Sequence, residues 1–171
     1  RNTLKRLVES GAISGSKADA WKKAMAEEAA VAALRARAEG GDARAMRQLG
    51  HSYRGGGRGL KKDKKQAFTW FKRAADLKDL HGLTACGEAY LLGHGVERSI
   101  SRGVAMMGVA AGMGSQAACG VLGWANAEGE YGFDKDPQEA TRWYREMQTC
   151  GKRNASEAGR ERAAAWLREH P

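Results

Sequence analysis

The segment "AMRQLGHSYRGGGRGLKKDKKQAFTWFKRAADLKDLHG", residues 45–82, decides the fold of this chain. It contains two stretches with helical spacing of apolar residues, separated by a glycine-rich turn. In the first stretch, small and apolar residues at positions 0, 4 and 8 from Ala45 form one buried face. In the second stretch, the apolar stripe consists of Ala67, Trp70, Phe71, Ala74 and Ala75. The pattern predicts two short helices around a hinge.

The skeleton of this segment recurs twice further along the chain, with a period of about 36 or 37 residues. The first copy is marked by Ala45, Leu49-Gly50, Tyr53, Gly56, Gly59-Leu60, Asp63, Ala67, Trp70-Phe71 and Ala74-Ala75. The second copy, with one loop residue fewer, has Gly82, Cys86-Gly87, Tyr90, Gly93, Gly95-Val96, Ser99, Gly103, Met106-Met107 and Ala110-Ala111. The third copy has Ala118, Leu122-Gly123, Asn126, Gly129, Gly132-Phe133, Asp136, Ala140 and Trp143-Tyr144. Because the glycines recur where the surrounding charges do not, we interpret them as hinge residues.

These residues resemble the Sel1-like repeat family, which is related to tetratricopeptide-like α-solenoids. The resemblance implies an all-α fold: a short right-handed α-solenoid of about three helix-turn-helix repeats with capping helices at both ends. We expect the repeats at about 45–81, 82–117 and 118–151. Cys86, Asn126, Ser99 and Met106-Met107 depart from the family pattern, as do Met147-Gln148 in place of two alanines.

The segments outside the repeats are expected to cap the solenoid. Residues 1–44 contain a degenerate half-repeat, and we expect one long helix from about Ser16 to Ala38. Residues 152–171 predict a terminal helix. End helices with polar outer faces keep the stacking surfaces of the first and last repeats out of water.

The composition favours a soluble protein that binds acidic partners. The formal net charge of +9 suits an acidic protein surface, RNA, DNA or an anionic membrane. No apolar run is long enough for a transmembrane segment, and "RNTLKRLVES" lacks the apolar core of a secretory signal. We expect the cytoplasm or an organellar interior rather than secretion. Since residue 1 is Arg rather than Met, we also expect that a leading segment has been removed or lies outside this sequence.

No pattern in the sequence predicts catalysis, a metal or a cofactor. The four histidines show no HExxH arrangement, and nothing combines a nucleophile, a base and an orienting group at defined spacing. Cys86, Cys119 and Cys150 lie more than thirty residues apart, so we interpret them as small helix-packing residues rather than as a zinc site or disulfide framework. We expect a chain that is not an enzyme.

Positions 2, 6 and 9 of each first helix project away from the face made by positions 0, 4 and 8. We therefore predict partner-binding residues on that side, namely Arg47, His51, Arg54, Glu88, Leu91 and Trp124. Two of them, Leu91 and Trp124, are apolar where a solvated face would be polar, as expected of interface anchors. An equally good interpretation packs Trp124 against the terminal helix.

The basic loop of the first copy is the other candidate contact. Its cations are Arg58, Lys61, Lys62, Lys64 and Lys65, with only Asp63 opposing them. We interpret it chiefly as a solvated loop and alternatively as a contact for an anion or RNA.

Two functions are therefore expected. The first is a non-enzymatic protein–protein interaction adaptor, or an accessory subunit of a larger assembly, that binds a protein partner along the solenoid. The alternative is a ribonucleoprotein subunit that contacts RNA through the basic loop.

Overall fold

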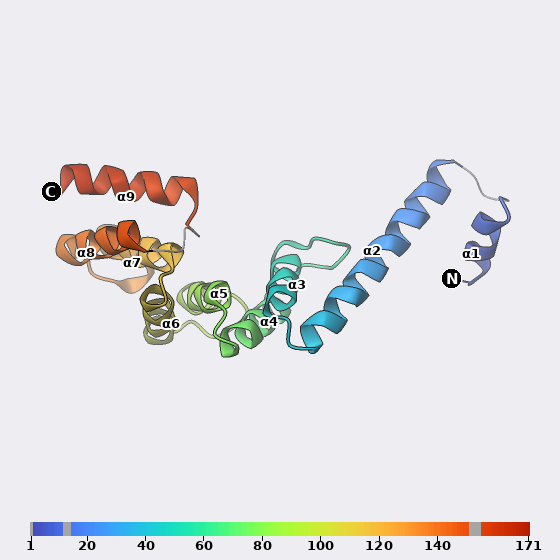
Figure 1. The fold of residues 1–171 in the computed structure, drawn as a ribbon, viewed down its shortest axis with the longest axis horizontal. Coiled ribbons are helices and arrows are strands. Elements are labelled where there is room, and N and C mark those ends of the chain that lie inside the picture. The colour runs from blue at the N-terminus through green and yellow to red at the C-terminus, as the bar shows by residue number, and fades with distance from the viewer. Residues whose placement is uncertain (1, 12–14, 151–154) are drawn as a thin grey trace.

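The structure, a computed structural model, describes residues 2–11, 15–150 and 155–171, and all regular elements within these ranges are helices (Figure 1). They are α1 (Asn2–Glu9), α2 (Ser16–Glu39), α3 (Ala43–Gly55), α4 (Lys64–Asp76), α5 (Leu80–Leu92), α6 (Ile100–Gly112), α7 (Gln116–Glu128), the 3₁₀ turn η1 (Glu130–Gly132), α8 (Pro137–Thr149) and α9 (Glu157–Glu169). The predicted all-α class is confirmed. None of the described helices combines the length and the apolar character needed to cross a membrane.

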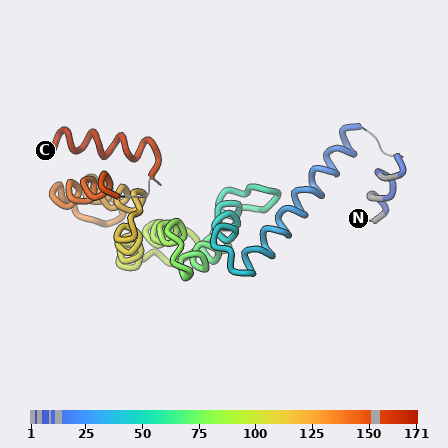
Figure 2. The backbone as a smooth tube through the Cα atoms, viewed as in Figure 1, coloured from blue at the N-terminus to red at the C-terminus, as the bar shows by residue number. Residues whose placement is uncertain are grey.

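The helices form a row of three hairpins, α3–α4, α5–α6 and α7–α8, and each helix from α2 to α9 packs on the next one along the chain (Figure 2). This is the expected α-solenoid. Each hairpin begins two residues before the repeat start that we expected: at 43 rather than 45, 80 rather than 82, and 116 rather than 118. The difference is the first turn of each helix, which precedes the first small residue of the pattern.

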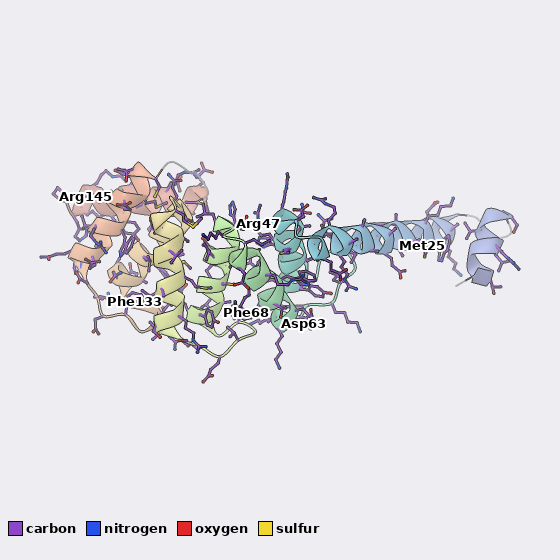
Figure 3. The ribbon with its side chains drawn as sticks, turned by 60° about the horizontal axis from the view of Figure 1, so that its bottom comes forward. Met25, Arg47, Asp63, Phe68, Phe133 and Arg145 are labelled. Carbon is purple, nitrogen blue, oxygen red and sulfur yellow. The ribbon has the colours of Figure 1, made fainter. Side chains whose placement is uncertain are left out.

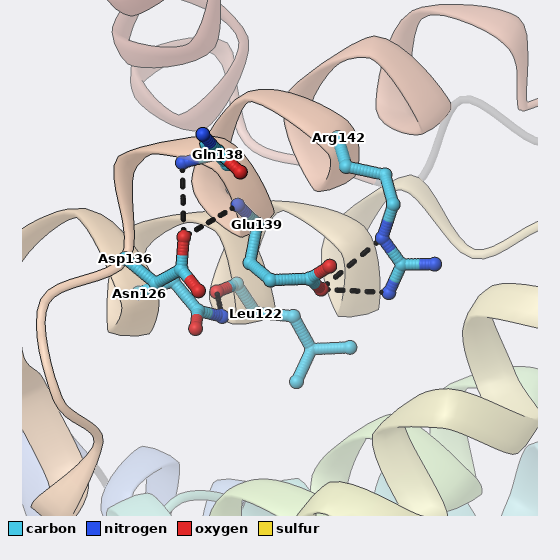
Figure 4. A network of polar contacts seen from close by, with 6 residues as sticks. All are labelled: Leu122, Asn126, Asp136, Gln138, Glu139 and Arg142. Atoms are coloured by element: carbon cyan, nitrogen blue, oxygen red, sulfur yellow. Dashed lines mark hydrogen bonds and ion pairs between the residues drawn. The ribbon is translucent and has the colours of Figure 1, made fainter.

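A side-chain cap begins every α-helix from α3 to α9. The cap residues are Asp42, Asp63, Asp79, Ser99, Ser115, Asp136 and Ser156, and each accepts a hydrogen bond from a backbone N–H in the first turn. Figure 4 shows Asp136, whose carboxylate accepts the N–H groups of both Gln138 and Glu139 at 3.0 Å. Such caps satisfy donors that the helix itself cannot pair.

The three hairpin loops share one construction. The first helix of each hairpin ends at a glycine in the left-handed region, where a side chain would be strained: Gly56, Gly93 and Gly129, with φ between 69° and 77°. A backbone hydrogen bond then closes each loop, for example from Asp63 N–H to the Tyr53 carbonyl at 2.8 Å. The additional loop residue of the first and third copies is Arg58 or Tyr131, and both have φ near 59°.

The core lies between the helices of each hairpin and between neighbouring hairpins. Trp70, expected to be a core residue, is 8% exposed. In the third hairpin Tyr144, the counterpart of Phe71, is only 1% exposed, whereas Trp143, the counterpart of Trp70, is half-buried. No fourth hairpin follows among the described residues to cover Trp143, and α9 instead places Trp166 against the Tyr144 ring.

Both ends of the row are covered by helices outside the three hairpins. The C-terminal half of α2 buries Val31, Leu34 and Ala38, and Leu34 and Ala38 share a cluster with α3 and α4. The N-terminal half of α2, which carries Met25, extends away from the hairpins (Figure 3). At the other end, α9 packs on both α7 and α8. The single helix Ser16–Glu39 agrees with the one that we expected from Ser16 to Ala38.

Candidate functional site

A groove between the first and second hairpins combines apolar and charged side chains. We call it the α3–α5 groove; its volume is about 270 Å³, and its lining residues are Arg54, Lys62, Lys64, Ala67, Phe68, Phe71, Ala85, Glu88, Ala89, Leu92 and His94. The apolar members form a floor, and the charged members form a rim. Four residues predicted from the sequence meet here: Arg54, Glu88, Lys62 and Lys64.

The floor of the groove is aromatic. Phe68 and Phe71 project from successive turns of α4, and the Phe68 ring packs edge-on against Tyr90 of α5, with ring centroids 5.3 Å apart. Leu92, at the end of α5, is 44% exposed and extends the apolar surface to solvent. Because two hairpins contribute to this floor, only the stacking of the repeats creates it.

The rim of the groove is mainly cationic. Arg54 at the end of α3 lies 3.6 Å from Glu88 of α5, measured from Nη1 to Oε2, and its guanidinium also lies over the Phe71 ring. Lys62 and Lys64 approach from the first hairpin loop and the start of α4. The lining therefore contains three cations and one carboxylate, and an anionic group entering the groove would meet an excess of positive charge.

Two titratable groups of the rim have shifted pKa values. Burial raises the pKa of the Glu88 carboxyl, and the Arg54 guanidinium opposes this shift. Burial also lowers the pKa of His94, and the positive charges of Lys64, Arg54 and Lys62 lower it further. At neutral pH the cationic character of the rim thus comes from Arg54, Lys62 and Lys64.

The remaining predicted partner-binding residues lie elsewhere. Arg47 forms an ion pair with Asp79, the cap residue of α5, with Nε and Oδ1 3.0 Å apart. In Figure 3, Arg47 lies at the opposite edge of the solenoid from Phe68 and Asp63. His51 packs edge-on against Phe71, and burial followed by the charges of Arg54, Arg47 and His81 lowers its pKa.

Leu91 does not lie on an exposed face, and the expectation of an exposed position for it is wrong. Its side chain is 1% exposed and fills the space above Gly103 of α6, where the other copies have alanine. The physical reason is that α5 is an internal helix of the solenoid. It packs on its own hairpin partner and on the preceding hairpin, so opposite faces of the helix are buried.

Trp124 is half-buried, and the interpretation that packs it against the terminal helix is confirmed. The Arg162 guanidinium of α9 lies 5.5 Å from the centre of the Trp124 ring, and the Tyr131 ring packs edge-on against it at 5.4 Å. Trp124 lines a separate hollow together with Gly159 and Arg162 of α9. It is not part of the α3–α5 groove.

The basic loop is divided between two surfaces. Arg58 lines a hollow against α2, beside Glu27 and Glu28, and does not line the α3–α5 groove. Lys61 and Lys65 are exposed and line neither hollow. The cations that appear as one cluster in the sequence are therefore separated in space, and of these loop cations Lys62 and Lys64 line the α3–α5 groove.

Phe68, Phe71, Leu92 and His94 are groove residues that the sequence analysis did not single out. Phe71 was assigned only to the core stripe, Leu92 ends α5, and His94 belongs to the second repeat's own loop. Only the contact between neighbouring repeats brings them beside Lys64.

A larger hollow of about 630 Å³ lies between α8 and the chain end, but its lining mixes Arg142 and Arg145 with Glu146 and has no aromatic floor. The residues described here contain no cluster of three or more His, Cys, Asp or Glu side chains placed to hold a metal ion.

Comparisons with known proteins agree with the repeat architecture. A family model described as Sel1 repeat matches residues 43–79, 81–115 and 116–147. The crystal structure of a Sel1 repeat protein from Oxalobacter formigenes has a TM-score of 0.63 and 29% sequence identity, over 77% of this chain and 51% of that protein. The structure of c5321, a protective antigen of uropathogenic Escherichia coli with an SLR fold, has a TM-score of 0.63 and 31% identity, over 71% of this chain and 26% of that protein.

Helicobacter pylori cysteine rich protein B has the same fold at 17% identity, with a TM-score of 0.56 over 81% of this chain and 95% of that protein. A search of curated proteins finds no match. The chain thus spans about half the length of the Oxalobacter protein and about a quarter of the Escherichia coli antigen.

Proposed function

Because this chain belongs to the Sel1 repeat family, whose members generally mediate protein–protein interactions on a non-catalytic scaffold, we propose that it is a non-enzymatic adaptor or assembly subunit. Its partner contributes an acidic segment with an aromatic or aliphatic side chain. That segment binds in the α3–α5 groove, so that the apolar side chain covers Phe68 and Leu92 and its carboxylates meet Arg54, Lys62 and Lys64.

The observation that carries this proposal is the cationic rim above an aromatic floor. An apolar surface alone would not select a partner by charge, and a basic loop alone would not select one by shape. Here both occur within one groove, on a chain with a net charge of +9. Arg54 is already paired with Glu88, so a partner carboxylate would compete for that guanidinium.

The test compares two double variants with identical changes in net charge. In Lys62→Glu with Lys64→Glu, both changed residues line the groove; in Lys61→Glu with Lys65→Glu, both lie outside it. The probe is a fluorescein-labelled peptide with Asp and Glu flanking a central Phe, titrated by anisotropy. We expect the groove variant to bind at least about tenfold more weakly and the control variant to bind within about threefold of the unmodified chain. Equal losses in both variants would contradict a groove site.

A second function is favoured by the density of cations between Arg54 and Arg73. In that alternative the chain is an accessory subunit of a ribonucleoprotein, and the loop contacts RNA phosphates. Such binding depends on total charge and falls steeply with salt, so both double variants should lose RNA affinity alike. Capture of partners on this chain from the native cell extract, with and without nuclease, completes the comparison. The adaptor proposal requires that proteins stay bound after nuclease treatment and that the Lys62→Glu, Lys64→Glu variant no longer captures them.

A further inference from the structure

Two cysteines that are distant in the sequence lie together in the third hairpin. Cys119 is in the first turn of α7, and Cys150 directly follows α8, 31 residues later. Because α7 and α8 are antiparallel, the start of one helix meets the end of the other, and the two Sγ atoms are 3.6 Å apart. A disulfide bond is about 2.05 Å long, so the sulfurs need to approach by only about 1.5 Å from that separation.

The two thiols differ in their access to solvent. Cys119 is fully buried, whereas Cys150 is half-buried at the end of its helix. Burial raises the pKa of the Cys119 thiol to about 12, and the neighbouring Cys150 and Glu146 act in the same direction. A reagent from solution would therefore meet Cys150 first, with Cys119 behind it as the second thiol.

We propose that Cys119 and Cys150 are a redox modification site, at which a small disulfide such as oxidised glutathione converts the two thiols into an intramolecular disulfide. The Cys150 thiolate attacks one sulfur of oxidised glutathione, forms a mixed disulfide and releases one glutathione thiolate. The Cys119 thiolate then attacks the Cys150 sulfur and releases the second. The protein loses two thiol protons and two electrons, and one oxidised glutathione becomes two reduced glutathiones.

The bond would join the two ends of the last hairpin beside the terminal cap. Gly120 of α7 already faces Met147 of α8, and a Cβ atom at Gly120 would lie 3.3 Å from the Met147 sulfur. Both residues line the hollow that α9 helps to form with Trp124. Oxidation would thus fix the end of the solenoid on which α9 packs. Neither α7 nor α8 contributes a lining residue to the α3–α5 groove, whereas Glu88 of α5 lines both hollows.

The experiment equilibrates the full chain with glutathione buffers of increasing oxidised fraction, alkylates the remaining thiols and maps them by mass spectrometry. We expect Cys119 and Cys150 to be lost together as one linked peptide pair while Cys86 stays fully alkylated. The product should remain a monomer on a non-reducing gel. Its midpoint of thermal unfolding should rise by at least about 5 °C, reversibly with dithiothreitol, because the bond closes a loop of about thirty residues.

Variants identify the order of the two steps. Cys119→Ala should stop the reaction at glutathionylated Cys150, Cys150→Ser should leave Cys119 unmodified, and Cys86→Ala should react like the unmodified chain. Three results would overturn the proposal: unmodified chain that stops at the mixed disulfide, a covalent dimer through Cys150, or thiols that stay free in oxidised glutathione alone. Mass-spectrometric mapping of the thiols in the unmodified chain tests whether the disulfide forms, even where a variant does not fold.

Discussion

Residue 123 of α7 is a glycine because the Tyr144 ring of α8 occupies the space that a larger side chain at this position would need. A Cβ atom at Gly123 would lie 2.7 Å from Cδ1 of Tyr144, well inside van der Waals contact. The first copy repeats the arrangement with Gly50 and Phe71. At these positions the leucine–glycine pair of the repeat is therefore a packing requirement between two helices, although glycine is a poor helix former.

The replacement Gly123→Ala should lower the free energy of unfolding by about 1 to 3 kcal/mol, because the added methyl group must displace a buried ring. Gly108→Ala is the matched control: Gly108 is also inside a helix, α6, but nothing lies within 4 Å of the place that an alanine Cβ would take there. At this position the gain in helix propensity should leave stability unchanged or raise it by up to about 1 kcal/mol. Urea denaturation followed by circular dichroism measures both, and equal effects would contradict the packing argument.

At the scale of the helix, each α-helix of the three hairpins begins at a residue whose side chain caps it, as α8 shows. The carboxylate of Asp136 accepts two N–H groups from the first turn of α8, and Pro137 occupies the next position, where its missing N–H is not needed. The backbone N–H of Asp136 also closes the third hairpin loop by donating to the Asn126 carbonyl at 2.8 Å. One residue thus ends the loop and begins the helix.

Asp136→Ala should destabilise the chain by about 1 to 2 kcal/mol, because two backbone donors lose their acceptor while the loop-closing backbone bond remains. Asp134→Ala removes the same charge from an exposed position in the same loop and should change stability by less than about 0.5 kcal/mol. Thermal or urea denaturation of the pair separates the loss of the cap from the loss of a charge. Equal stability of the two variants would show that the Asp136 cap does not stabilise α8.

At the scale of the whole molecule, stacking decides where charge and apolar surface coincide. Glu88 and His94 belong to the second hairpin, and the cations that line the groove with them, Arg54, Lys62 and Lys64, belong to the first. As the pH falls, Glu88 loses its negative charge at a higher pH than an ordinary glutamate, because its pKa is raised. His94 gains its positive charge at a lower pH than the ordinary histidine value of 6.5, because its pKa is lowered. Both changes make the groove more positive.

The affinity for the acidic peptide should therefore rise by a few fold as the pH falls from about 6.5 towards about 5, a range that lies below the ordinary pKa of histidine and above those of peptide Asp and Glu. Glu88→Gln should bind more tightly at pH 7.5 and show a flatter pH profile. Glu97→Gln, the same charge change at an exposed position that does not line the groove, should follow the unmodified chain. Anisotropy titrations measure all three, and an affinity that falls with decreasing pH would contradict this electrostatic description of the groove.

The sequence by itself determined the helical class, the repeat and its hinges, because these depend on local spacing: apolar residues at helical intervals, glycines at left-handed positions and aspartate or serine before each helix of the three hairpins. It also named four groove residues, Arg54, Lys62, Lys64 and Glu88, from their charge and helix position.

Only the tertiary structure decided which of these residues meet. Leu91 is buried because α5 packs on two sides, Trp124 lies under α9, and Arg58 turns toward α2. His94 of the second hairpin joins Phe68 and Lys64 of the first, and within the third hairpin the start of α7 brings Cys119 beside Cys150 at the end of α8. The physical reason is that a repeat pattern records how each hairpin folds on itself, whereas a site on a solenoid is made by the surfaces that neighbouring helices bring together.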